Sequence, residues 1–340
     1  MVDINPRKTT PLRWGFLSTA RINRALIEPL NSSERNSLLA VGGRSRQRAE
    51  EFAQKWNIPR AYGTYQDLLD DPDIDVIYNS LPNSLHAEWT VKAVRAGKHV
   101  LCEKPLAVSL SEVDEIADAS QKSGRFVAEA FMYRHHPQTI LAKELIDRGE
   151  VGEVRLVKGA FTFNLTKQGD IRLNKSLGGG CLWDVGCYPV SFTRFILGRE
   201  PAEVFGWQIT GDSGVDEAFT GQMRFDSDPP YTNGTVLAQF DSGFRSRFRA
   251  SMEIVGSEGT LLISDPFKPD FGAKLILERE SGIESILVPD QGLYFGEVED
   301  MANAVLINAP PRISLADSRA NVRVILALLE SARVDATVRV

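Results

Sequence analysis

Short apolar segments typical of buried strands alternate with segments of helical pattern through the first third of the chain. The expected strands cover residues 14–18, 38–43, 75–81, 99–102 and 126–130. The expected helices cover residues 20–30, 47–56, 84–96 and 112–122. Repeated units of one strand and one helix of this length imply a parallel, doubly wound sheet. The sequence therefore predicts an α/β domain over residues 1–131.

The remaining residues, 132–340, contain long strand candidates and fewer helices. The strands are expected at 154–164, 204–210, 219–225, 235–241, 246–255, 260–264 and 274–280. The helices are expected at 136–148, 188–197 and 315–332, with a hairpin turn at 256–259 and a polar loop at 226–233. Apolar Phe248, Ala250, Met252 and Ile254 alternate with polar neighbours, as in a sheet with one covered face. Because an open sheet face often joins another subunit, we expect a homo-oligomer.

Composition limits the functions open to this chain of 340 residues, a length at which two domains are the default. The net charge of −6 argues against a general binder of nucleic acid or anionic membranes. The three cysteines and four histidines match no zinc, redox or HExxH spacing, so we expect neither a metal site nor a disulfide framework. A polar start and the lack of a long apolar run predict a cytoplasmic protein.

The turn after the first expected strand is a candidate dinucleotide loop. Such loops usually read GxGxxG, because glycine lets the backbone approach the pyrophosphate. Ser18, Ala20 and Asn23 occupy the three glycine places here, so small residues are kept although the pattern is degenerate. The amides at this helix start can still cradle a phosphate, and a plain strand-to-helix turn is the alternative. The expected contact residues are Ser18, Thr19, Ala20, Arg21 and Ile22.

The end of the second expected strand indicates which dinucleotide is preferred. An NAD-specific fold usually places an acid there for the ribose hydroxyls, but this chain has Arg44 and Ser45, with Arg48 following. Arginine matches a phosphate by bidentate hydrogen bonds, whereas an acid would repel it. We therefore predict a preference for NADP(H), with NAD(H) still possible. A solvated basic helix start is the alternative reading.

Polar residues follow two further strands at the edge where open α/β sheets bind ligands. Glu103, Lys104 and Pro105 follow the strand at 99–102, and Glu103 could orient the lysine ammonium. The alternative is a solvated turn. The strand at 75–81 is followed by Asn83 and His86, which alone would be a helix N-cap and a packing residue. The expected cofactor contacts at this edge are Ser80, Leu81, Asn83, His86, Glu103 and Lys104.

Six stretches spread over nearly the whole chain resemble, in the same order, the Gfo/Idh/MocA oxidoreductase family: WGFLSTARIN, SLPNSLHAEW, HVLCEKPLAVS, AFMYRHHP, GGGCLWDVGCYP and IVGSEGT. The resemblance implies an N-terminal Rossmann domain and a C-terminal α+β domain with a large open, mostly antiparallel sheet. It implies dimers or larger oligomers. It also implies that Lys104 lies beside nicotinamide and substrate, that the Lys104–Pro105 bond is cis, and that Leu81, Asn83 and His86 lie near the nicotinamide.

The second-domain motif of the family usually reads DxGxH, with histidine as the proton-transfer group. Here it runs from Asp184 to Tyr188, which resembles the branch of dimeric dihydrodiol dehydrogenases and NADP-dependent D-xylose 1-dehydrogenases. Tyr188 would take the substrate's proton if the Lys104 ammonium lowered its pKa, and a core tyrosine is the alternative. Asp184 is expected to cap the helix and to bind a substrate hydroxyl or Lys104; a pure N-cap is the alternative.

These residues predict an NADP-dependent dehydrogenase acting on a sugar hydroxyl, such as that of D-xylose or D-glucose. Lys104 and Tyr188 would handle the proton, with Asp184 as the third catalytic residue. Arg134 is expected to contact cofactor or substrate, or else to form a structural ion pair, and Trp183 lines the pocket or packs. The alternatives are a trans-dihydrodiol dehydrogenase, a non-catalytic NADP-sensing protein on the same fold, and an enzyme that uses bound NAD transiently in glycoside cleavage.

Overall fold

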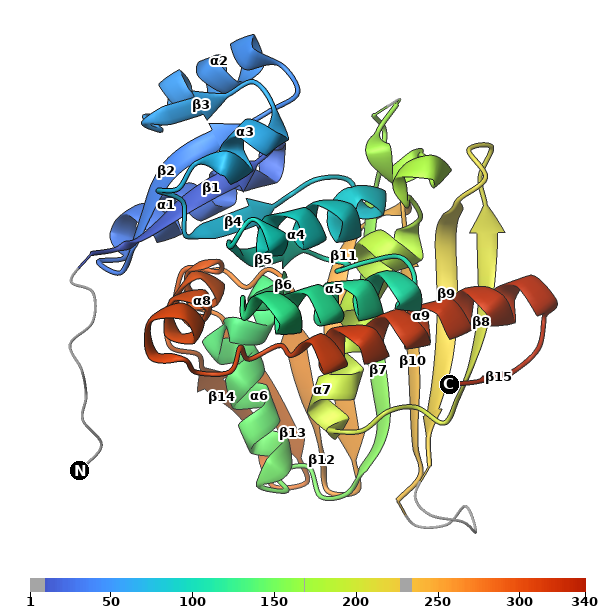
Figure 1. Ribbon diagram of the computed structural model, residues 1–340. Helices are drawn as coiled ribbons and strands as arrows, with labels where there is room; N and C mark the ends of the chain where they lie inside the picture. The colour runs from blue at the N-terminus through green and yellow to red at the C-terminus, as the bar shows by residue number, and fades with distance from the viewer. Residues whose placement is uncertain (1–9, 168, 227–233) are drawn as a thin grey trace. The chain divides into compact units, whose positions relative to one another are not determined.

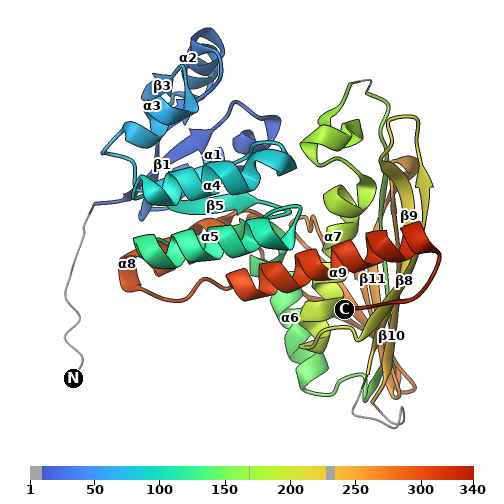
Figure 2. The same ribbon diagram turned by 45° about the vertical axis from the view of Figure 1, so that its right-hand side comes forward.

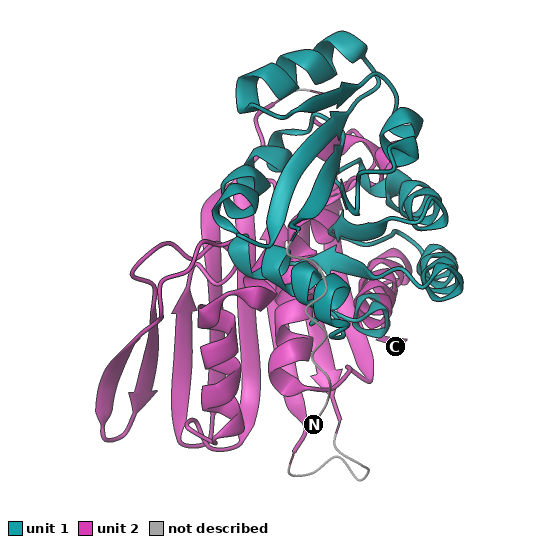
Figure 3. Ribbon diagram, turned by 60° about the vertical axis from the view of Figure 1, so that its left-hand side comes forward, with its two compact units in different colours: residues 1–131, 294–318 teal, residues 132–293, 319–340 magenta. Residues whose placement is uncertain are grey.

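The computed structural model describes residues 10–167, 169–226 and 234–340 (Figure 1). The chain divides into two compact units, one of residues 1–131 and 294–318 and the other of residues 132–293 and 319–340 (Figure 3). Of the polar loop expected at 226–233, all but Asp226 lies outside the described residues. In the described part of the chain no helix is long and apolar enough to cross a membrane.

A six-stranded parallel sheet forms the centre of the first unit, in the order β3-β2-β1-β4-β5-β6. Its strands are β1 (Leu12–Leu17), β2 (Asn36–Gly42), β3 (Arg60–Tyr62), β4 (Val76–Asn79), β5 (His99–Glu103) and β6 (Val127–Ala130). The helices are α1 (Arg24–Ser32), α2 (Arg46–Trp56), α3 (Tyr65–Asp70), α4 (His86–Arg95) and α5 (Leu110–Ser123). The predicted doubly wound fold is confirmed. The strand order reverses between β1 and β4, so ligands are expected at the carboxyl ends of these strands.

A late segment of the chain completes the core of the first unit. Helix α8 (Phe295–Ile307) buries Val298 and Met301 in the same apolar cluster as β1, β2 and α1. Its Glu299 accepts hydrogen bonds from Arg35 Nη1 at 3.0 Å and from Ser33 Oγ at 2.5 Å. Residues 294–318 therefore belong to the first unit and not to the predicted second domain, because a local pattern does not reveal which distant sheet a helix will cover.

The second unit contains a nine-stranded sheet in the order β14-β13-β12-β11-β7-β10-β9-β8-β15. Its strands are β7 (Val154–Asn164), β8 (Glu203–Thr210), β9 (Asp216–Phe225), β10 (Val236–Gly243), β11 (Arg245–Gly256), β12 (Gly259–Ser264), β13 (Lys274–Arg279), β14 (Gly282–Leu287) and β15 (Val338–Arg339). Strands β7 and β10 run parallel and the other neighbours run antiparallel, so the predicted mostly antiparallel sheet is confirmed. Helices α6 (Pro137–Asp147), α7 (Cys187–Leu197) and α9 (Leu315–Val334) lie on one side of it (Figure 2).

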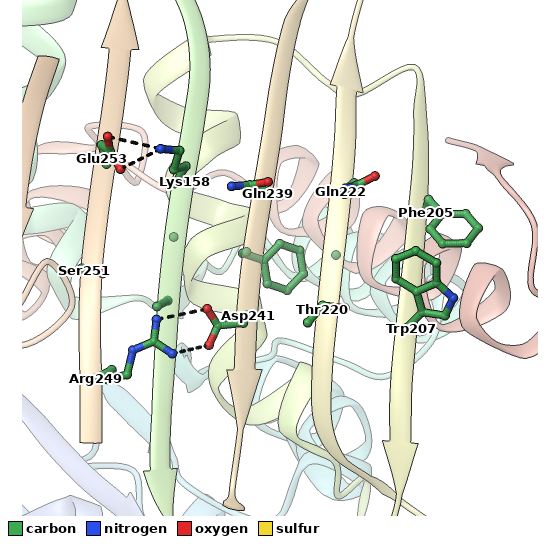
Figure 4. A pocket seen from close by; sticks show the side chains of 14 residues that line it. Lys158, Phe205, Trp207, Thr220, Gln222, Gln239, Asp241, Arg249, Ser251 and Glu253 are labelled. Carbon is green, nitrogen blue, oxygen red and sulfur yellow. Dashed lines mark hydrogen bonds and ion pairs between the residues drawn. The ribbon is translucent and has the colours of Figure 1, made fainter. Parts of the chain in front are cut away.

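The other face of this sheet is open and carries both charged and apolar side chains. Strand β11 buries Met252 and Ile254 and exposes Arg249 and Ser251, as its alternating sequence predicts. Phe248 differs, because 54% of its surface is exposed where the β11–β7 register shifts. Figure 4 shows this face, where Lys158 pairs with Glu253 and Arg249 with Asp241, and where Trp207 lies on β8, two strands from Asp241. These side chains line an open pocket of about 490 Å³.

Candidate active site

The loop after β1 is held by a buried hydrogen-bond cluster in place of the usual glycines. Ser18 Oγ lies 2.9 Å from Ser80 Oγ, and Ser80 donates to Asn23 Oδ1 at 2.5 Å. Asn23 Nδ2 donates in turn to the Ser18 carbonyl at 2.7 Å. Ser18 has a φ of 135°, a region that favours glycine. Glycine would adopt this φ without strain. Here the hydrogen-bond cluster holds Ser18 in that conformation instead.

The geometry of this loop fits the phosphates of a dinucleotide. Ser18 Oγ accepts from the Ala20 amide at 3.0 Å, so that amide is used inside the loop. The next residues, Arg21–Asn23, form a 3₁₀ turn that runs into α1, and no side chain caps the start of this turn. The amides of Arg21 and Ile22 are therefore suited to an external phosphate oxygen. Thr19 lies on the same loop, with its methyl group beside Gly43.

Arg44 and Ser45 lie directly after β2, at the carboxyl edge of the sheet. Ser45 is the N-cap of α2, and its Oγ accepts from the Arg48 amide at 3.4 Å. Arg44 is exposed. Burial raises the pKa of the nearby Tyr65 hydroxyl, and the charge of Arg44 opposes that rise. The residues from 42 to 48 include no acid, so the donor set at this strand end fits a phosphate better than a diol.

Lys104 occupies a turn that is fixed on both sides. Glu103, the last residue of β5, accepts a hydrogen bond from the Tyr78 hydroxyl. The Lys104–Pro105 peptide bond is cis, as the family resemblance implies. The amide of Leu106, just beyond, donates to a carboxylate oxygen of buried Glu129 at 2.9 Å. The backbone that carries Lys104 is therefore anchored to β4 through Glu103 and to β6 through Leu106.

His86 connects this turn to the loop after β4. Its Nδ1 lies 2.7 Å from the Pro105 carbonyl and its Nε2 2.7 Å from the Leu81 carbonyl. The ring is 1% exposed, and burial lowers the pKa of His86 although the two carbonyls oppose that shift. Both ring nitrogens are engaged with the protein's own backbone. Any contribution of His86 to cofactor binding therefore runs through Leu81, Asn83 and Lys104, whose loops it holds.

A buried carboxyl that the sequence analysis did not single out lies near this turn. Glu297 of α8 is 1% exposed, and neither of its carboxyl oxygens has a hydrogen-bond partner among the described residues. Burial, with the nearby charge of Glu103, raises the pKa of Glu297 well above its ordinary value. Burial also raises the pKa values of Tyr78 and Tyr294, and the nearby carboxyls of Glu103 and Glu297 raise them further. Burial without a hydrogen-bond partner therefore disfavours the charged form of Glu297.

In the second unit, Asp184 forms an ion pair that the sequence did not predict. It lies in a π-helical turn, Leu182–Gly186, and accepts from Arg172 Nε at 2.7 Å. Arg172 also contacts Asp170 at 3.2 Å, and the charge of Asp184 raises the pKa of Arg172. The predicted N-cap role of Asp184 is wrong, because neither this turn nor α7 has a side-chain cap on its N-cap residue. The helix begins earlier, and Asp184 lies within it. Such π-helical turns are frequent at functional sites.

Tyr188 lies at the second position of α7 within a cluster of aromatic rings. The centroid of its ring is 5.2 Å from that of Phe161, 5.3 Å from Phe267 and 5.6 Å from Tyr133. Its hydroxyl lies 3.8 Å from Met132 Sδ, and the side chain is 4% exposed. The ring therefore packs as a core residue, which is one of the two alternatives that the sequence leaves open. The same packing fixes the position of the hydroxyl, which is the group that would take part in proton transfer.

Arg134 and Trp183 are both buried within the second unit. The Arg134 guanidinium lies 4.1 Å over the Phe195 ring and donates from Nη1 to Ser191 Oγ at 3.2 Å. These contacts with α7 favour a structural role for Arg134. Trp183 is 6% exposed in the π-helical turn beside Asp184, which favours packing.

A parallel sheet with a loop suited to phosphate and an anchored lysine turn at its carboxyl edge is typical of dinucleotide-dependent oxidoreductases. Residues 12–131 match the family model described as "Oxidoreductase family, NAD-binding Rossmann fold". Residues 139–262 match the model described as "GFO/IDH/MocA C-terminal domain". The chain belongs to the Gfo/Idh/MocA family of oxidoreductases.

Relatives within the family are named for different substrates. The chain is 35% identical to "D-xylose 1-dehydrogenase (NADP(+)) 2" of Haloferax volcanii, covering 96% of this chain and 99% of that one. It is 35% identical to a trans-1,2-dihydrobenzene-1,2-diol dehydrogenase of Danio rerio over 74% of each chain. A solved 3-ketoreductase from Actinomadura kijaniata, in complex with NADP and TDP-benzene, is 29% identical with a TM-score of 0.87 over 95% of this chain and 98% of that one.

The raised pKa of Glu297 predicts how stability depends on pH. Since the pKa of Glu297 is higher in the folded chain than the value of about 4.3 expected when unfolded, the folded state keeps this proton at pH values at which the unfolded state has lost it. The contribution of Glu297 to stability should therefore fall with rising pH, by up to about 1.4 kcal/mol per pH unit. The Glu297→Gln variant should lose less stability than wild type as the pH rises above about 5 in urea unfolding. Parallel curves for the two proteins would mean that Glu297 is ionised when folded.

Proposed function

We propose that the protein is an NADP-dependent dehydrogenase that transfers a hydride between a sugar hydroxyl, that of an aldose such as D-xylose or D-glucose, and the nicotinamide. The observation that carries the proposal is the anchored turn at Lys104, held through Glu103, His86 and Leu106. The naming of a relative as a D-xylose 1-dehydrogenase supports the substrate class. We place the enzyme in the cytoplasm, which the three buried cysteines without disulfides support.

The preference for NADP(H) rests on the strand end at Arg44. The 2′-phosphate of NADP would be bound by the Arg44 guanidinium and by donors at the Ser45 helix start, while Ser18 to Ile22 would hold the pyrophosphate. The xylose dehydrogenase named above is NADP-dependent, and the ketoreductase structure holds NADP. When bound, the nicotinamide supplies the acceptor for the hydride.

Lys104 and Tyr188 handle the proton in this proposal. The Tyr188 phenolate would take the proton of the reacting hydroxyl, and a lysine ammonium favours that phenolate over a phenol with an ordinary pKa of about 10. Two solved structures of the 3-ketoreductase carry a Tyr-to-Phe and a Lys-to-Ala replacement. The lysine and tyrosine replaced there are separated by the same number of residues as Lys104 and Tyr188. Asp184 would accept a hydrogen bond from a substrate hydroxyl.

A vicinal diol is the second candidate substrate. The identity of 35% to a dihydrobenzenediol dehydrogenase equals that to the xylose dehydrogenase, although it extends over less of the chain. Both substrates present adjacent hydroxyls, and the same proton chemistry applies to each. A panel of aldoses and trans-diols with NADP⁺, followed by NADPH absorbance, separates the two. An absence of NADPH formation with every compound would overturn the proposed function.

We further propose that the chain forms a homodimer or a larger homo-oligomer through the open sheet face. That face carries both signs of charge, in the pairs Lys158–Glu253 and Arg249–Asp241, so it can complement a second copy of itself (Figure 4). Trp207, which is 58% exposed there, is the kind of large side chain that is enriched in interfaces.

Replacing the proposed proton-handling residues tests the mechanism. Lys104→Met and Tyr188→Phe should each lower kcat by about 10²- to 10⁴-fold, because each removes a group that acts on the transferred proton. Thermal unfolding should show that both variants are folded. Tyr133→Phe, a buried tyrosine in the same aromatic cluster, should retain most of the activity. Turnover near the wild-type rate in either test variant would refute the assignment.

Replacing Arg44 tests the cofactor preference. Arg44→Ala should raise the KM for NADP⁺ about 10- to 100-fold, which is the loss expected for a charge-assisted contact. The KM for NAD⁺ should change little. Arg46→Ala is the matched control, since that nearby exposed arginine is already paired with Glu50. A wild-type enzyme that prefers NAD⁺ would contradict the cofactor assignment.

The oligomer is tested by a charge placed in the open face. Trp207→Asp should shift the mass measured by sedimentation from that of an oligomer to that of a monomer. The control is Ile307→Asp, an equally exposed apolar position on α8 of the first unit. A wild-type chain that sediments as a monomer would refute this proposal.

A further inference from the structure

The helix that carries Asp184 and Tyr188 begins without a capping side chain of its own. Its first hydrogen bond of the helical type runs from the Asp184 amide to the Gly180 carbonyl at 3.1 Å, so Gly180 directly precedes the first residue with helical backbone angles, Cys181. Glycine offers no side-chain acceptor to the exposed amides that follow. Asp216, at the start of β9, supplies the acceptor instead: its Oδ2 accepts from the Leu182 amide at 2.6 Å.

Asp216 is a fixed and buried group. Its side chain belongs to a residue that is 6% exposed, and the same oxygen accepts from Cys181 Sγ at 3.1 Å. A carboxylate at the first amides of a helix also has a favourable interaction with the helix dipole. The start of the helix is therefore set by a residue from a neighbouring strand, more than thirty positions further along the chain.

Gly180 is shaped to admit this carboxylate. Its φ is +126°, which L side chains rarely adopt, and a Cβ built on it would lie 2.2 Å from Asp216 Oδ1. The Gly180 amide donates to the Arg172 carbonyl at 2.9 Å. The neighbouring Gly179 amide donates to the Asn174 carbonyl at 3.0 Å, so the turn that carries Arg172 is tied to the same short loop.

Both partners of the Arg172–Asp184 ion pair are thus located by one carboxylate. Asp184 lies two residues beyond the Leu182 amide that Asp216 binds. Arg172 is bonded through its backbone to Gly180, which packs directly on Asp216. A guanidinium and a carboxylate held side by side present donors and acceptors in fixed directions, as recognition of adjacent hydroxyls requires.

We propose that Asp216 is a positioning residue that holds the Arg172–Asp184 pair in register to bind adjacent hydroxyls of the substrate. This inference rests on the proposed function and extends it, because it assigns hydroxyl recognition to the pair and its orientation to Asp216. Asp216 does not itself touch the reacting atoms.

The first test separates positioning from a general loss of stability. Asp216→Asn should lower kcat/KM for the sugar about 10- to 100-fold, chiefly through KM, as a displacement of about 1 Å in a binding pair would. The dissociation constant for NADP⁺ should not change, since the residues proposed to bind it belong to the first unit. Asp71→Asn is the matched control: Asp71 is equally buried, at 6% exposure, and accepts from Arg60 and Tyr62 of the first unit. It should lower stability and leave the sugar KM unchanged.

The second test is a double-mutant cycle. If Asp216 acts through the pair, adding Asp216→Asn to Asp184→Asn should cost little more in kcat/KM than Asp184→Asn alone. Losses that multiply would overturn the proposal, as would a wild-type sugar KM in Asp216→Asn.

A third measurement needs no substrate. Amide hydrogen exchange over residues 170–188 should be faster in Asp216→Asn than in wild type and unchanged in Asp71→Asn. Unchanged exchange in Asp216→Asn would overturn the positioning role whatever the enzyme acts on. A wild-type protein inactive on every sugar and diol would instead refute the proposed function, and the exchange result would still decide the role of Asp216.

Discussion

His86 joins the turn that carries Lys104 to the loop that follows the neighbouring strand. An imidazole whose two nitrogens each lie 2.7 Å from a backbone carbonyl fixes the loop after β4 and the turn after β5 with respect to each other. These segments come from neighbouring parallel strands, whose carboxyl ends must lie at one edge. The sheet brings the two loops to the same edge, and His86 sets the distance between them. Glu103 and Glu129 then remove the remaining freedom of the turn.

A second theme is that the loops of this enzyme are held by side chains where related folds rely on glycine. The dinucleotide loop keeps its shape through hydrogen bonds among Ser18, Ser80 and Asn23, although Ser18 has a positive φ. In the second unit the opposite is found: Gly180 has no side chain to cap the helix, and this leaves room for the carboxylate of Asp216, which binds the Leu182 amide. In both places the local sequence pattern alone would suggest a weakened motif. The hydrogen bonds show that a distant residue supplies what the motif lacks.

Local periodicity was sufficient to predict most of the fold. The parallel strands and the long strands such as 154–164 follow from apolar runs and from alternation at a period of two. What failed depends on distant contacts. The structure brings α8 onto the core of the first unit, far away in the sequence. It also caps the Asp184 helix with Asp216 and pairs Asp184 with Arg172. None of these contacts is visible in the pattern of neighbouring residues. The carboxyl of Glu297 was missed for the same reason, because its environment exists only after α8 returns to the first unit.

The return of α8 to the first unit also constrains how the chain can be made. The apolar surface of β1, β2 and α1 is completed by Val298 and Met301, which the ribosome synthesises only after nearly the whole second unit. The nucleotide-binding half therefore cannot finish its core while it is still the nascent N-terminal segment, although domains generally fold in order of synthesis. A gene fragment ending at Phe131 would encode six strands with one side of their core uncovered. Recombination between family members at that junction would separate a sheet from the helix that seals it.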